Sequence, residues 1–418
     1  MTVELRAPFA PAAEPPPAAA SRSPRLPQPP MWLVVVAGVV LVVTLVAAFL
    51  AALRTGIPID EPYHVTRLRT YMATGHFAMP GVSGADLLRD RFTYAPVTML
   101  ALHALCWVLG IDGFGTVSTT ATAYAVRHVG VFLMGVVGLG AVAGTARVLL
   151  RSWRWGVVAA ALLAAMPTWM GHLAFNIKDI PVATGASLVT FGLVWLAAVQ
   201  WRERSSWPAP VAAGVVLTSG LVLALGTRVG MWPLLAAQVV AYAALLSLAR
   251  RMRVSGVLGL VVPGVVAYAV LVLVYPYVFA HPLLAMRGSV SAATEFRPDP
   301  PSRTYVPEYL IVEVPTLMLL AAGVGSLVAI VAVVARLRRP EESTVAYAVV
   351  GLQALLMPAL SVAEDASLYS GLRQLLFVFP GLAILAAVGL AWLLGRCRPG
   401  GWARPALAGL LAASALLA

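Results

Sequence analysis

The chain has 418 residues, of which 60% are hydrophobic and only 11% are charged, and its mean hydropathy is +0.88. A soluble domain carries roughly 45–50% apolar and about 25% charged residues. This composition excludes an ordinary soluble protein and indicates helices embedded in a membrane. The net charge of +12 would also suit a nucleic-acid-binding protein, so the distribution of that charge has to decide between the two.

The first 30 residues contain nine prolines and few bulky apolar side chains. Such a segment cannot form a packed core, and we expect residues 1–30 to be a disordered cytoplasmic tail. The apolar run that begins at Met31 is too long for a secretory signal and lacks a small-residue cleavage site. Residues 31–418 are therefore expected to form a single membrane-embedded domain.

Apolar runs of about 20 residues, the length that crosses the hydrocarbon layer of a bilayer, follow one another along this domain. They predict an all-α polytopic membrane helix bundle of about eleven spans. The last run ends at Ala418 without a polar exit, so either the chain is truncated or its natural end lies just beyond a short final helix. The expected spans are 32–53, 123–148, 155–175, 181–201, 209–226, 231–249, 256–277, 309–335, 344–362, 371–395 and 403–418.

The arginines predict the orientation of the bundle. Alternate loops, together with the tail, hold 17 basic and 5 acidic residues, whereas the loops on the other side hold 12 of each. Because excess positive charge marks the cytoplasmic side, we expect a multi-pass plasma-membrane protein with a cytoplasmic N-terminus, and we reject nucleic acid as a partner. All six histidines fall on the outer side, where the loops 54–122 and 278–308 are long. Function is therefore expected at the outer face.

The first outer loop opens with the sequence Ile-Asp-Glu-Pro-Tyr-His at 59–64. An aspartate followed by an acid and a proline is typical of a helix start. A helix that begins here places Asp60, His64, Arg67 and Tyr71 on one face, because they are four, three and four residues apart. The two interpretations are compatible, and the polar stripe predicts the wall of a cleft at the membrane surface.

A second polar block reads Gly-His-Leu-Ala-Phe-Asn-Ile-Lys-Asp-Ile-Pro at 171–181. Its Lys178 is the only lysine among 29 basic residues. A composition that otherwise uses arginine indicates that a compact ammonium group is needed at this position. A polar turn before a helix that restarts at Pro181 is the structural alternative, and we favour the functional interpretation.

The first block resembles the first outer loop of the C-type membrane glycosyltransferases, which include protein O-mannosyltransferases and the bacterial aminoarabinose transferases. The similar features are an Asp-Glu pair after the first span, Arg69, and the sequence Thr-Gly-His-Phe at 74–77. Tyr94-Ala-Pro followed by an amphipathic stretch at 97–111 resembles the surface-lying helix of that family, where Tyr-Pro-Pro is more usual. The resemblance thus implies surface-lying helices in the first outer loop.

The second block resembles the Phe-Asn-Pro-Lys-Asp-Ile-Pro signature of a bacterial subgroup of the same family, with Ile177 in place of proline. Two of three weaker similarities are Arg228, which lies between two apolar spans, and the sequence Tyr-Ser-Gly-Leu-Arg-Gln at 369–374. The latter resembles the Asp-Gly-Leu-Arg-His segment of the family with Ser for Asp and Gln for His. Only Arg373 is carried over from it, as a phosphate contact.

The resemblance implies transfer of a sugar from a polyprenyl-phosphate donor to a hydroxyl acceptor, which is a protein, a glycan or a lipid, on the outer face of the bilayer. The reaction would be an inverting displacement in which Asp60, paired with Glu61, provides the carboxylate base. The phosphate leaving group needs cations rather than a general acid. The expected substrate-binding residues are Lys178, Asp179, Arg69, His172, Arg228, Arg373, His64 and Tyr94, with Arg67 as an alternative to Arg69.

The sequence contains no glycine-rich phosphate loop, no His-Glu-x-x-His motif and no paired-cysteine spacing, and Cys106 and Cys397 fall on opposite sides of the predicted membrane. We therefore expect no metal or other cofactor, and the sequence does not support a divalent cation. A transporter or lipid flippase is the main alternative function, but it should show a hydropathy repeat with broken helices near the midplane. A scaffold protein would not need the Asp60 and Lys178 blocks.

The predicted topology can be tested by cysteine labelling in intact cells. A membrane-impermeant maleimide should label a Ser83→Cys variant, because residue 83 is expected outside, and should label Arg338→Cys only after the membrane is opened. The reverse pattern would contradict the orientation derived from the arginines.

Overall fold

The computed structural model describes residues 27–82, 96–202, 208–295, 302–397 and 409, and within these ranges the chain forms helices and no β-strand. The helices of the first half are α1 (Met31–Arg54), α2 (Glu61–Thr74), α4 (Pro96–Val108), α5 (Ala121–Leu150), α6 (Trp153–Ala164), α7 (Pro167–Leu173), α8 (Asp179–Gln200) and α9 (Pro208–Thr227). Those of the second half are η1 (Val229–Met231), α10 (Trp232–Leu248), α11 (Val254–Val274), α12 (Pro276–Phe279), α13 (Pro282–Glu295), α14 (Tyr305–Glu313), α15 (Thr316–Arg336), α16 (Glu342–Ala363), η2 (Arg373–Val378) and α17 (Phe379–Arg396).

Nine helical segments in the described ranges are long and apolar enough to cross a membrane. The count rises to ten if α6 and α7, which are bent by 78° at a short break, form one span. The predicted all-α polytopic bundle is therefore confirmed, and the predicted span 403–418 lies outside the described residues except for residue 409. A bundle of helices satisfies its backbone hydrogen bonds internally, which the bilayer interior requires.

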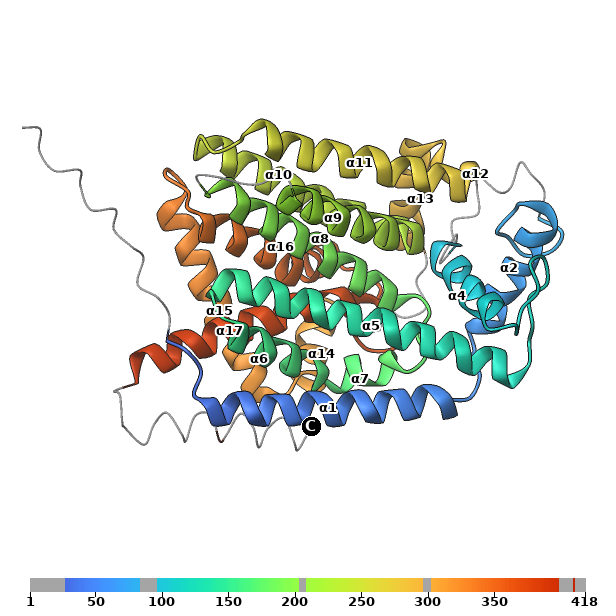
Figure 1. Cartoon of the computed structure of the whole chain (residues 1–418), viewed down its shortest axis with the longest axis horizontal. Helices are drawn as coiled ribbons and strands as arrows, with labels where there is room; N and C mark the ends of the chain where they lie inside the picture. The colour runs from blue at the N-terminus through green and yellow to red at the C-terminus, as the bar shows by residue number, and fades with distance from the viewer. Residues whose placement is uncertain (1–26, 83–95, 203–207, 296–301, 398–408, 410–418) are drawn as a thin grey trace, which may run out of the picture.

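Two helices form the core of the bundle. In the most apolar window of the η2–α17 segment 94% of residues are buried, and the value for α8 is 83%. The corresponding values are 17% for α1 and 22% for α11, so these helices expose their apolar side chains at the periphery, where lipid would contact them. Figure 1 shows α8 and α17 between the other helices, with α1 along one side and α11 along the opposite side.

Glycines bring α15 and α17 close together. A Cβ atom on Gly325 would collide with the carbonyl oxygen of Leu385 and would lie 3.0 Å from the amide nitrogen of Gly389. A Cβ atom on Gly389 would in turn collide with the carbonyl oxygen of Ala321. Small residues at helix crossings allow this approach, which is how membrane helices gain van der Waals contact without a hydrophobic driving force.

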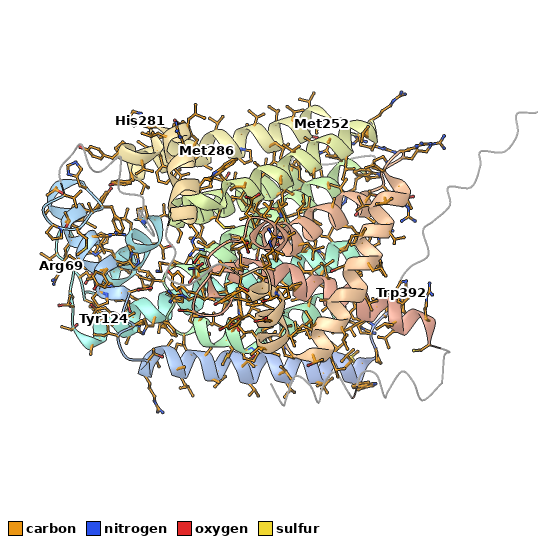
Figure 2. The ribbon with its side chains drawn as sticks, turned by 180° about the vertical axis from the view of Figure 1, so that it is seen from behind. Arg69, Tyr124, Met252, His281, Met286 and Trp392 are labelled. Atoms are coloured by element: carbon orange, nitrogen blue, oxygen red, sulfur yellow. The ribbon has the colours of Figure 1, made fainter. Side chains whose placement is uncertain are left out.

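The connections between spans divide into two ends of the bundle. The short helices α2, α4, α12 and α13 gather at one end, which is the right-hand end in Figure 1. Arg69 and Tyr124 lie at this end and Trp392 lies toward the other end (Figure 2). The Tyr71 hydroxyl of α2 donates a 2.7 Å hydrogen bond to the carbonyl of Val274, and its ring packs edge-on against Tyr275. These contacts fix α2 against the end of α11.

The close crossing of α15 and α17 predicts a position-specific cost of added volume. Gly325→Ala should destabilise the protein by about 1–3 kcal/mol, because the new methyl group overlaps the backbone of α17. Gly323→Ala is the matched control on the same helix, since a Cβ there meets nothing within 4 Å. Thermal unfolding in detergent should show a lower midpoint for the first variant only. Equal midpoints for both variants would contradict the packing described here.

Candidate functional site

Asp60 and Lys178 meet at the end of the bundle that carries the short helices. Asp60 is the residue before α2, and Lys178 is the residue before α8, 118 positions later in the chain. The Lys178 ammonium donates a 2.9 Å hydrogen bond to Oδ2 of Asp60. The Lys178 side chain is 17% exposed and the Asp60 side chain is 37% exposed, so the pair is accessible from outside the protein. The two blocks that the sequence singled out thus form one site.

A second cation reaches the same carboxylate. Nη2 of Arg373, at the start of η2, lies 3.6 Å from Oδ2 of Asp60, and its guanidinium lies over the ring of Tyr369. Because one oxygen atom of Asp60 faces both cations, the carboxylate neutralises part of the charge of Lys178 and part of that of Arg373. An anion that competes with Asp60 would find two positively charged donors already in position.

Asp179 and Arg228 form a neighbouring ion pair of 2.7 Å. The Asn176 side chain organises the turn that carries Asp179: its Nδ2 donates to Oδ2 of Asp179 at 2.9 Å and also lies 3.1 Å from Nδ1 of His172. Nη1 of Arg228 donates to the carbonyl of Gln374, the residue that follows Arg373. Lys178, Asp179, Arg228 and Arg373 are therefore held in one network together with His172.

The electrostatics of the site favour an ionised Asp60 and a neutral His64. Burial alone would raise the pKa of the Asp60 carboxyl, but the hydrogen bond from Lys178 and the charges of Lys178 and Arg373 outweigh it and hold this pKa below its ordinary value of 3.8. Burial lowers the pKa of His64 to about 3, helped by the charges of Lys178 and Arg67. At neutral pH Asp60 can accept a proton, and His64 carries no charge.

Two predicted site residues have other partners. Glu61 is 1% exposed, and its Oε2 lies 2.8 Å from Nε2 of His128 on α5, so it belongs to a buried pair beneath the site. Arg69 points away, since its Nε and Nη2 donate to the carbonyl of Val117 at 3.1 and 2.9 Å. Figure 2 shows Arg69 at the margin of the molecule. Both residues hold the segment between α1 and α5 in place and do not contact Asp60 or Lys178 through the interactions described.

Tyr94 and the helix expected after it differ in what the structure describes. Tyr94 lies outside the described residues, as does the Tyr-Ala part of its motif, whereas the helix expected after it is present as α4. The sequence interpretation did not single out His128, which pairs with Glu61, or Gln374, whose carbonyl oxygen accepts a hydrogen bond from Arg228. For Asn176 a signal existed, because it lies within the block 171–181 and an asparagine before a helix commonly organises a turn.

Comparisons with known proteins give matches only among solved structures. No family model matches the chain, and no curated protein sequence matches it either. ArnT from Cupriavidus metallidurans, solved with bound undecaprenyl phosphate, superposes with a TM-score of 0.53 and 20% identity, over 93% of this chain and 64% of the ArnT chain. Its structure in the apo state gives 0.54 and 21% over the same shares.

The archaeal oligosaccharyltransferase AglB from Archaeoglobus fulgidus, solved in complex with an inhibitory peptide and a dolichol-phosphate, gives a TM-score of 0.60 at 13% identity. The match covers 90% of this chain and 54% of the AglB chain, so the chain spans less than two thirds of either protein. At such identities the likeness concerns the fold. The fold of this chain is therefore one that ArnT and the oligosaccharyltransferase AglB also have.

Proposed function

We propose that the protein is a membrane glycosyltransferase that moves a sugar from a polyprenyl-phosphate donor to an acceptor hydroxyl at the outer face of the plasma membrane. The observation that carries the proposal is the Asp60 carboxylate held between Lys178 and Arg373 at one end of a bundle with the C-type glycosyltransferase fold. The ligands bound in the structures of two proteins with this fold, undecaprenyl phosphate and a dolichol-phosphate, support a lipid phosphate as the donor.

The chemistry of the site suits this reaction. The acceptor oxygen attacks the anomeric carbon, its proton passes to Asp60, and the bond from that carbon to the phosphate oxygen breaks with the electron pair leaving on the phosphate. Lys178, Arg373 and Arg228 are the proposed contacts for that phosphate. These three cations and the two carboxylates Asp60 and Asp179 leave one positive charge in excess, which favours binding of an anion.

The roles of the other groups follow from their positions. Asp179 orients Arg228 through the 2.7 Å ion pair, and His172 lies on the other side of Asn176, where it can contact the sugar or the phosphate. Burial keeps His64 neutral at pH 7, and we assign it a hydrogen-bonding role. The proposal includes no cofactor and no metal.

The general test is a transfer assay with purified protein in nanodiscs and a panel of undecaprenyl-phosphate sugars. Transfer to an acceptor from one of these donors would support the proposal. If the protein in vesicles moved a lipid-linked sugar from one leaflet of the membrane to the other without transferring the sugar, the flippase alternative would be indicated instead. No turnover and no donor binding with any member of the panel would contradict the proposed function.

Asp60→Asn should separate binding from catalysis. The amide keeps the shape of the side chain and can still precede the helix, since Asn and Asp are similar as N-cap residues. Loss of the base should slow transfer by roughly 10²–10⁴-fold. Binding of undecaprenyl phosphate should become tighter, because no carboxylate then competes for Lys178 and Arg373.

The matched control for that variant is Asp365→Asn, which neutralises an exposed carboxylate paired with Arg303 at 3.5 Å. It should leave both transfer rate and donor affinity unchanged. A wild-type transfer rate in Asp60→Asn would reduce Asp60 to a structural residue at the helix start.

Lys178 should be replaceable only in part by arginine. Lys178→Ala should weaken the binding of undecaprenyl phosphate and slow transfer, because it removes the ammonium nearest Asp60. Lys178→Arg should restore part of the affinity, since the charge remains but the planar guanidinium has a different size and geometry. Transfer rates measured against donor concentration for the two variants and wild type test this, with Arg303→Ala at an exposed arginine as the control. Full activity in Lys178→Arg would indicate a simple interfacial anchor.

A further inference from the structure

Arg373 depends on a short turn whose backbone is unusual. The two residues before Leu372 both have positive φ, 57° at Ser370 and 68° at Gly371. Residues other than glycine rarely adopt a positive φ unless neighbouring groups hold the backbone in that conformation. The turn delivers Arg373 to Asp60 and presents the carbonyl of Gln374 to Arg228. Whatever fixes the turn therefore fixes two of the proposed phosphate contacts.

The Glu313 carboxylate at the end of α14 holds this turn. Its Oε1 accepts a 2.9 Å hydrogen bond from the backbone N–H of Leu372, and its Oε2 accepts one of 2.9 Å from the hydroxyl of Thr168 on α7. The carboxylate lies so close to Gly371 that a Cβ atom at that position would collide with Oε1 and lie 3.1 Å from Cδ. Glycine is thus required at 371 for two reasons, its φ and the approach of Glu313.

Tyr305 holds the same turn from the start of α14. Its hydroxyl accepts a hydrogen bond from the N–H of Gly371 at 3.1 Å and lies 3.4 Å from the Gly371 carbonyl, to which it can donate. Glu313 and Tyr305 both come from the segment between α13 and α15, and Thr168 lies on the helix that also carries His172. The three contacts therefore join α14, α7 and the turn that precedes η2.

We propose that Glu313 is a positioning residue for Arg373: its carboxylate fixes the turn at 370–372 so that the Arg373 guanidinium faces the donor phosphate beside Asp60. This inference rests on the proposed function for the identity of the ligand. Glu313 itself does not contact Asp60 or Lys178 through any interaction described, so it acts through the turn. A carboxylate suits this role because it accepts hydrogen bonds at both oxygens, one from a backbone N–H and one from a hydroxyl.

The test is a double-mutant cycle read as the dissociation constant for undecaprenyl phosphate in nanodiscs. Glu313→Ala should weaken binding about tenfold, because the turn loses the acceptor for the Leu372 N–H. Arg373→Ala should weaken it by a similar or larger factor. The double variant should be no weaker than Arg373→Ala alone, because the two changes act on one contact and are not additive.

Three further variants separate positioning from general destabilisation. Glu313→Gln keeps an oxygen that can accept from Leu372 and should restore most of the affinity, whereas Tyr305→Phe should reproduce part of the loss. Glu308→Ala, an exposed glutamate on the same helix, should leave the affinity unchanged. Because these readouts are affinities, a change in unfolding temperature alone would not produce the pattern.

The outcomes are distinct for this inference and for the proposed function. Wild-type affinity in Glu313→Ala, or additive losses in the double variant, would overturn the role of Glu313. A wild-type protein that binds undecaprenyl phosphate but transfers no sugar would overturn the proposed reaction and leave the positioning role supported. Absence of binding in the wild type would overturn both.

Discussion

The ion pair between Asp60 and Lys178 is the constraint on which the rest of the site depends. It joins the start of α2 to the start of α8, across 118 positions of sequence. α8 is one of the two most buried spans, so the residue that precedes it is fixed by the core of the bundle. Asp60 is fixed in turn because α2 is tied to α11 through Tyr71. A site built on rigid helix ends keeps its geometry when a ligand binds.

The oppositely charged groups of the site offset one another's cost of leaving water. Removing a charged group from water costs free energy unless an opposite charge or hydrogen bonds replace the water. Asp60 lies between two cations, and Asp179 lies between Arg228 and the Asn176 amide. This alternation offsets the cost of holding five charged groups close together and partly away from water. It also means that each cation is already aimed at an oxygen atom, the kind of atom that a phosphate would present in its place.

The sequence singled out each member of the central pair, because Lys178 departs from the arginine-rich composition and Asp60 opens a polar stripe, but it did not indicate that the two side chains meet. Glu61 and Arg69 matched the same family pattern, yet their side chains point to His128 and to the carbonyl of Val117. Adjacent residues on a helix point in directions about 100° apart, so a motif can place one of them in a site and the next in the core.

Length and polarity of the segments follow from the sequence alone, because each apolar run is long enough to cross a bilayer and each loop carries its own charges. Those properties are local, so the helices, the grouping of polar blocks at one end and the predicted orientation needed no tertiary information. Only the tertiary structure decided which polar groups of different loops touch. Glu313 shows why: by sequence it is an ordinary acid near the start of the predicted span 309–335, and its contact with the backbone of Leu372 exists only because the end of α14 lies against the turn before η2. The partners of a side chain depend on how helices that are far apart in the chain pack against one another. The spacing of residues along the sequence does not predict those contacts.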